Sequence, residues 1–433
     1  MNQLGLAATL RLGLFQGCLG CLAVIFSGLL NRVMLSELAF PGLLVGGALA
    51  FEQFVSPSRV LFGQISDAHP WAGRHRLPYI WLGTALFCMF AVAAIPLIFF
   101  VGRLLQADQA VSLALAIAAL CGLFALYGLA VSLATTPYLA LVIDRTSEAE
   151  RPRAVGIIWC MLTVGIVIGA ITIAISLRSL DGITDPLQLE PVLFAFMVKV
   201  AIAVLLLTLV ATAGMESPRT TSRLGQDQVD RQDAITLAQA WALITSSRQV
   251  LIFFAFLVCF TLALFLQDPI LESYGAQVFG MPIAATASLN AYWGLGTLAG
   301  LLLAGLWLVP WLGKLAAARL GGQLIVGSLG LLLLSGLTAN VALLTVVLFL
   351  FGIAAGIGTN SALVLMLDLT LPQAAGTFVG VWGLAQALSR ALGKVMGGAL
   401  LDLGRLLQQA MPWGDGPWFS YALVVAVSPG CWP

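Results

Sequence analysis

The chain of 433 residues is 60% hydrophobic and only 9% charged, whereas an ordinary soluble domain carries about 25% charged residues. So few charges cannot cover a water-soluble globule of this size, and the composition therefore indicates a protein that crosses the bilayer several times. The net charge of +1 excludes a nucleic-acid-binding protein, and seven scattered cysteines exclude a disulfide-rich secreted domain.

Twelve apolar stretches follow one another along the chain, each bounded by charges or turn residues. In the first, Arg11 precedes a long apolar run without a small-residue cleavage site, so we expect a retained span rather than a signal peptide. The last stretch ends within about 15 residues, which indicates a short or truncated final span. The predicted spans are 10–31, 40–62, 78–101, 111–142, 154–177, 191–213, 249–271, 282–309, 318–338, 340–367, 375–401 and 417–431.

One long polar stretch, from Gly214 to Arg248, divides these spans into six plus six. The sequence therefore predicts an all-α polytopic membrane protein made of two six-helix bundles. We expect an N-terminal bundle at 1–213, a cytoplasmic linker at 214–248 and a C-terminal bundle at 249–433.

Lysine and arginine are distributed unevenly between the two sides of this topology. The side that holds the N-terminus and the central linker collects thirteen of them in its loops, and the other side holds four, namely Arg32, Arg103, Arg178 and Arg405. Because basic residues are retained on the cytoplasmic side, we expect the N-terminus and the linker to be cytoplasmic.

The two halves contain one short pattern in corresponding positions. Asp144 ends the fourth span and is followed fifteen residues later by Trp159, and Asp368 ends the tenth span and is followed fourteen residues later by Trp382. This pattern predicts an internal repeat, with coincidence in a sequence rich in Leu, Ala and Gly as the alternative. Asp368 is therefore one candidate coupling residue.

The loop between the second and third spans carries a specific spacing of small and charged residues. Gly63 permits close helix approach, Asp67 can accept hydrogen bonds from a helix start, and arginines beyond the turn can pair with carboxylates at neighbouring helix ends. We expect this loop to be a conformational latch that joins the two bundles in one state; the alternative is a simple turn with cytoplasmic positive charge. The latch residues are Gly63, Asp67, Gly73, Arg74 and Arg76.

This loop resembles the loop signature of the major facilitator superfamily. The stretch from Gln267-Asp268 through Glu272, Tyr274-Gly275 and Val278-Phe279-Gly280 resembles a block of the PucC/LhaA family, the bacteriochlorophyll-delivery branch of that superfamily. Similar blocks occur at Asn31–Leu38, Ser58–Asp67, Arg76–Trp81 and Leu367–Gly383. The resemblance implies a major-facilitator-type fold.

The resemblance also implies delivery or handling of chlorophyll or bacteriochlorophyll while light-harvesting or photosystem complexes assemble in the photosynthetic membrane of a bacterium. The implied partners are the lipid bilayer, subunits of those complexes and pigment-biosynthesis enzymes. Two alternatives stay open: a proton-coupled transporter of an unrelated small solute, and an assembly chaperone that transports nothing. The sequence contains no phosphate-binding loop and no catalytic or metal-ligating constellation, so we do not expect an enzyme.

Ionisable residues inside the spans are candidates for the mechanism, because a charge costs about 2.5–3.5 kcal/mol at the centre of a membrane helix. Glu52 and Arg59 are seven residues apart, which on a continuous helix places them two turns apart on one face. Asp268 and Glu272 have the four-residue spacing that places two carboxylates on one helix face. Gln267 lies beside them, and Arg390 and Lys394 have the same four-residue spacing on the eleventh span.

We expect a carboxylate of this set to pair with the basic face of the eleventh span, and a change of that pairing to drive alternating access. The alternative is a set of static interhelical salt bridges or of charges that extend to the headgroups.

Pigment contacts are predicted from the metal chemistry of a chlorin, whose magnesium takes oxygen and nitrogen ligands. Both histidines of the chain, His69 and His75, lie in one loop, so we expect no permanent pigment and only transient binding of chlorophyll or bacteriochlorophyll. Buried amides are candidate ligands and tryptophans are candidate stacking partners, although aromatic residues in spans more often serve packing. The candidates are Gln53, Asn290, Trp293, Asn360, Trp382 and Gln386.

Overall fold

Helices form nearly all of the described chain in the computed structural model, and the β-structure there is one bridge between Trp71 and Arg74. The structure describes residues 5–71, 73–107, 110–146, 151–178, 186–216, 248–369, 375–410 and 417–428. Most of the predicted linker, and the side chains of Asp67, Asp368 and Trp382, lie outside the described residues.

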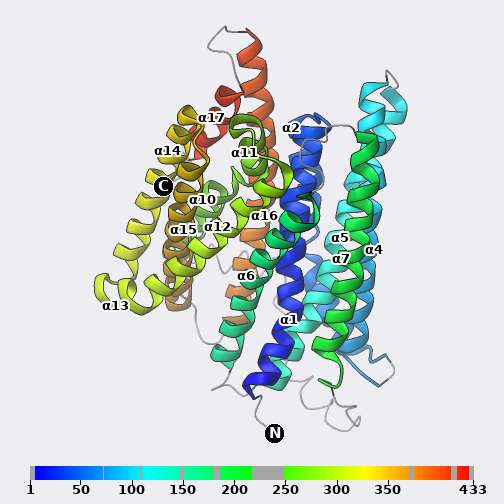
Figure 1. The fold of residues 1–433 in the computed structure, drawn as a ribbon. Helices are drawn as coiled ribbons and strands as arrows, with labels where there is room; N and C mark the ends of the chain where they lie inside the picture. The colour runs from blue at the N-terminus through cyan, green and yellow to red at the C-terminus, as the bar shows by residue number, and fades with distance from the viewer. Residues whose placement is uncertain are drawn as a thin grey trace.

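The N-terminal half alternates in direction between two ends of the molecule (Figure 1). We call the end with the first residues of the chain the near end and the opposite end the far end. The elements are α1 (Leu6–Ala23), the π-helical segments η1 (Val24–Leu30) and η2 (Val33–Glu37), α2 (Gly42–Phe54), α3 (Ser58–Ala68), α4 (Leu77–Gln106), α5 (Ala110–Arg145), α6 (Arg151–Ser176) and α7 (Pro186–Thr212).

The C-terminal half begins at Arg248 and also runs back and forth, with α17 at the far end and α13 at the near end (Figure 1). Its elements are α10 (Arg248–Phe265), the 3-10 turn η5 (Asp268–Ile270), α11 (Leu271–Phe279), α12 (Ile283–Leu303), the π-helical η6 (Ala304–Leu308), α13 (Val309–Leu312), α14 (Lys314–Thr338), α15 (Val341–Leu369), α16 (Ala375–Ala410) and α17 (Trp418–Val427).

Helix covers most of each predicted span within the described residues, and nine helical stretches there are long and apolar enough to cross a membrane. The other three predicted spans are not long and apolar enough to meet this description, each for a physical reason. The second is interrupted between α2 and α3, the eleventh carries charges on α16, and the last, α17, has ten residues. The chain is an integral membrane protein.

The predicted internal repeat has a counterpart in the helix boundaries. Asp144 is the penultimate residue of α5, and Asp368 is the penultimate residue of α15. The two aspartates therefore end corresponding helices of the two halves.

Among the described elements, the most extensive contacts between the halves are those of α2 with α16 and of α6 with α12. At the first contact the backbones of Gly42 and Gly398 approach so closely that a side chain at either position would collide with the backbone of the other helix. Gly46 meets the carbonyl of Lys394 in the same way. Small residues thus place α16, with its charges, directly against the N-terminal half.

Candidate functional site at the interface between the halves

The interior charged cluster, which we define as Glu52, Arg59, Asp268, Arg390 and Lys394, gathers residues from both halves, and Arg59 is its exposed member. Asp268 interacts electrostatically with Lys394 and with Arg390. Arg390 in turn interacts with Glu52 and Arg59 of the N-terminal half. Its guanidinium carbon lies 4.5 Å from the centroid of the Phe265 ring, a cation–π contact. The structure therefore brings a predicted carboxylate to the basic face of α16.

The prediction that Glu52 and Arg59 share one helix face is wrong. The helix ends at Phe54, and a turn through Pro57 separates α2 from α3, so the two-turn register is lost. Arg59 still interacts electrostatically with Glu52. The Glu52 carboxylate also accepts a hydrogen bond from Gln53 Nε2 at 3.2 Å.

The expected shared helix face of Asp268 and Glu272 is also wrong, because Asp268 belongs to η5 and Glu272 to the first turn of α11. The Glu272 side chain is 3% exposed and accepts a hydrogen bond from Asn290 Nδ2 at 2.5 Å. It also interacts electrostatically with Arg32. The position of a Cβ at Gly28 would overlap Glu272 Oε1, so glycine leaves room for this carboxylate where it lies. The two carboxylates thus serve different partners.

A set of polar contacts at the far end, which we call the far-end clasp, joins the halves through Asn31, Arg32, Asp402 and Arg405. Arg32 is 4% exposed and donates hydrogen bonds to Thr286 Oγ1 at 2.5 Å and to the Met281 carbonyl at 3.0 Å. It also forms an ion pair with Glu37 at 3.4 Å. Asn31 Nδ2 donates to the carbonyl oxygen of Pro269.

The remaining members of the clasp bind the start of α2. The two carboxylate oxygens of Asp402 accept hydrogen bonds from the backbone amides of Gly42, at 2.6 Å, and Leu43, at 2.7 Å. Arg405 pairs with Asp402 at 3.5 Å and donates to the carbonyl of Phe40 at 3.5 Å. A carboxylate from the C-terminal half therefore caps a helix of the N-terminal half.

A second polar set, the near-end cluster, consists of Ser66, Arg76, Asp144 and Glu216. Arg76 Nε pairs with Asp144 Oδ2 at 3.3 Å, and Arg76 Nη1 donates to Ser66 Oγ at 2.8 Å. The Glu216 carboxylate accepts hydrogen bonds from three successive backbone amides at the start of α4, those of His75, Arg76 and Leu77. These contacts tie α3, α4, α5 and the segment after α7 together.

The predicted latch loop lies beside this cluster. Gly73 has φ +71°, a conformation that L side chains rarely adopt, and it allows the tight turn in which Trp71 and Arg74 exchange two backbone hydrogen bonds. Gly63 faces Thr136 of α5 at ordinary contact distance. These contacts lie within the N-terminal half. The role of Asp67 stays a prediction, because its side chain lies outside the described residues.

The predicted pigment contacts occupy different environments. Asn290 is bonded to Glu272, whereas Trp293 meets Phe265 edge to face with ring centroids 6.4 Å apart. Asn360 has a buried side-chain nitrogen without a hydrogen-bond partner among the described residues. Gln386 is half-buried on α16, and the side chain of Trp382 lies outside the described residues.

Gln267 holds a distinctive position within this set. Its Nε2 donates to the Leu264 carbonyl, and its Oε1 is buried without a donor among the described residues. Asn31 Oδ1 is likewise buried without a donor among the described residues. The junction of the halves therefore contains two buried amide oxygens that accept no hydrogen bond within the described part of the chain.

The sequence-based prediction of site residues omitted four important side chains: Asn31, Arg32, Asp402 and Arg405. Counting basic residues places both Arg32 and Arg405 among the loop charges. For Arg32, the signal against a loop position is the apolar run Val33-Met34-Leu35 directly after it, since a loop arginine is rarely followed by a further apolar turn.

A family model described as "PUCC protein" matches residues 29–430. The chain is 33% identical to the "Uncharacterized protein in puhA-bchM intergenic region" of Rhodobacter capsulatus, over 93% of this chain and 81% of that protein. It is 31% identical to "Protein PucC" of Cereibacter sphaeroides, over 99% and 90%. It is also 31% identical to the "Bacteriochlorophyll synthase 44.5 kDa chain" of Rhodobacter capsulatus, over 93% and 89%.

Two solved structures illustrate the similarity of the fold. A point mutant of the nucleoside transporter NupG has a TM-score of 0.67 at 14% identity, over 98% of this chain and 97% of that chain. The D-xylose-proton symporter has a TM-score of 0.62 at 17% identity, over 99% and 96%. These similarities confirm the predicted all-α, major-facilitator-type fold.

Proposed function

The chain belongs to the PUCC protein family, and from this premise we propose that it handles bacteriochlorophyll or chlorophyll while light-harvesting or photosystem complexes assemble. The family match over residues 29–430 carries the proposal. One relative is named for bacteriochlorophyll synthase and another for its position between puhA and bchM. The transporter-like fold supports a role in moving or holding a ligand rather than in catalysis.

The interface between the halves offers suitable ligand chemistry. The orphaned amide oxygen of Gln267 is a hard donor of the type that magnesium prefers. Trp293, which packs edge to face on Phe265, is the proposed stacking surface for a macrocycle. An amide is a weak ligand compared with histidine, which suits transient rather than permanent binding.

The interior charged cluster is the proposed coupling element. Asp268 neutralises part of the positive charge of Arg390 and Lys394, so protonating or displacing Asp268 leaves two cations without that carboxylate in a nonpolar region. Such a change favours a rearrangement of α16 relative to α10 and α2. We propose that this rearrangement alternates access to the interface.

The proposed setting follows from the same premise. The protein acts in the photosynthetic membrane of a bacterium, with the N-terminus cytoplasmic as the basic residues predict. Its proposed partners are light-harvesting or photosystem subunits and the enzymes that supply the pigment.

Gentle detergent extraction from a photosynthetic host, followed by absorption spectroscopy and identification of bound proteins, tests the function. We expect substoichiometric pigment and subunits of light-harvesting or photosystem complexes to co-purify. Recovery of neither would contradict the proposal and favour a transporter of an unrelated small solute. Recovery of subunits without pigment would favour an assembly chaperone.

Complementation of a deletion strain tests the coupling element. We expect Asp268→Asn and Glu52→Gln to lower the yield of pigmented complexes at equal protein levels. Glu190→Gln is the matched control, because Glu190 forms an exposed pair with Arg103 away from the cluster. Wild-type yield in both test variants would remove the coupling role.

A further inference from the structure

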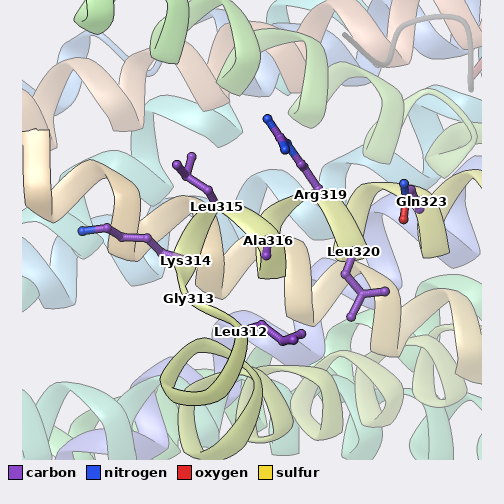
Figure 2. A pocket seen from close by; sticks show the side chains of 8 residues that line it. All are labelled: Leu312, Gly313, Lys314, Leu315, Ala316, Arg319, Leu320 and Gln323. Atoms are coloured by element: carbon purple, nitrogen blue, oxygen red, sulfur yellow. The ribbon is translucent and has the colours of Figure 1, made fainter.

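A surface cleft of about 530 Å³ lies at the near end where α13 meets α14. Its lining combines apolar side chains, including Leu312, Leu315 and Leu320, with the basic side chains of Lys314 and Arg319. Figure 2 shows the nitrogen atoms of both basic residues directed away from the helix ribbon. The cleft therefore presents positive charge beside an apolar floor.

The charge of this region is entirely positive along the chain. Lys314 and Arg319 are the only charged residues in the sequence between Glu272 and Asp368. Both side chains are exposed, so their positive charge favours the approach of anions to the cleft.

The position of the cleft corresponds to the membrane surface. Two apolar spans, Ile283–Leu312 and Lys314–Thr338, meet at Gly313 beside it. Trp307 is 64% exposed and Trp311 is 82% exposed, and tryptophans on the outside of a membrane protein concentrate at the depth of the headgroups. Basic side chains at that depth meet phosphate groups, while the leucines meet the glycerol and the upper acyl chain.

We propose that this cleft binds the headgroup of an anionic phospholipid, with Lys314 and Arg319 on the phosphate. The near end is the side that the basic residues predict to be cytoplasmic, and the cytoplasmic leaflet carries the negative surface potential that such a site uses. This site is separate from the interface between the halves, and it does not depend on the proposed function.

Native mass spectrometry of the purified protein with phosphatidylglycerol or phosphatidylcholine tests the site. We expect preferential retention of phosphatidylglycerol, and about 30-fold weaker binding in the double variant Lys314→Gln/Arg319→Gln, because each basic residue near the surface contributes roughly a factor of five. The conservative variant Lys314→Arg/Arg319→Lys should keep the binding. Arg103→Gln/Arg178→Gln, which removes the same charge elsewhere, should leave it unchanged.

Three outcomes would overturn the proposal. Equal binding of phosphatidylglycerol by wild type and the Lys314→Gln/Arg319→Gln variant would exclude these residues as the site. Displacement of the lipid by equimolar glycerol phosphate would assign the cleft to a soluble phosphate compound. A disulfide-linked dimer of a Leu312→Cys variant in lipid nanodiscs would assign the cleft to a second copy of the chain.

Discussion

The far-end clasp and the near-end cluster are built from the same chemistry, yet they connect different parts of the molecule. In both, an almost fully buried arginine meets a carboxylate, and another carboxylate caps the start of a helix. The clasp joins the two halves, whereas the contacts described for the near-end cluster lie inside the N-terminal half. Capping of a helix by a carboxylate thus holds two bodies together at one end and stiffens one body at the other.

The difference indicates how the molecule would change state. If the halves move as bodies, the contacts of the clasp that cross between the halves must break, whereas those of the near-end cluster can persist. Substitutions at the two ends should therefore separate a conformational effect from a purely structural one.

Arg32→Ala should have the largest effect. Arg32 is buried with three partners, and its removal leaves Glu37 and Glu272 without that cation, which should lower the free energy of unfolding by about 3–5 kcal/mol. Thermal or denaturant unfolding in mixed micelles measures this. A loss below about 1 kcal/mol would show that the halves do not depend on Arg32.

Breaking the Arg76–Asp144 pair should have the second-largest effect. A double-mutant cycle of Arg76→Gln and Asp144→Asn should give a coupling of about 1–3 kcal/mol in the free energy of unfolding, because both side chains are mostly buried. Spin labels at Leu43→Cys and Leu403→Cys, two exposed far-end positions, should keep their distance distribution. A changed distribution would contradict the view that this cluster is local.

Asp402→Asn, unlike the substitutions of Arg76 and Asp144, should change the distance between the two halves at the far end. An amide replaces only part of the capping of Gly42 and Leu43 and loses the charge, so the clasp should weaken by about 1–2 kcal/mol. With the same spin labels, a longer distance between Leu43→Cys and Leu403→Cys should gain population. An unchanged distribution would mean that the glycine contacts between α2 and α16 hold the far end without Asp402.

Arg103→Gln should have the smallest effect. Its ion pair with Glu190 is short, at 2.8 Å, but Arg103 is 54% exposed and both helices belong to the N-terminal half. The change in the free energy of unfolding should stay below about 1 kcal/mol. A larger loss would show that exposure is a poor guide to the ranking of these pairs.

The fold could be predicted from the sequence largely because long apolar runs and basic loops are strong signals. The breaks inside helices were harder. Pro57 and Pro269 each lie at a break between two residues that were predicted to share a helix face. A proline disfavours the helical conformation at the residue before it. Yet Pro96, Pro137 and Pro191 lie within continuous helices, so proline alone does not locate a break.

The site was only partly predictable for a related reason. The four-residue spacing of Arg390 and Lys394 identified the basic face of α16, because that helix is continuous there. The partners of Arg32 are a threonine hydroxyl and a backbone carbonyl about 250 residues away. No pattern of residue types in one sequence encodes such a contact, since it depends on how the two halves meet.

The cap that Asp402 places on α2 makes hydration a condition for separating the halves. When α16 withdraws, the amides of Gly42 and Leu43 lose their acceptor, and each then needs another hydrogen-bond acceptor. Water has to enter as the carboxylate leaves. Opening of the far end is in this sense a wetting transition, and its rate should respond to anything that keeps water out of the seam between α2 and α16.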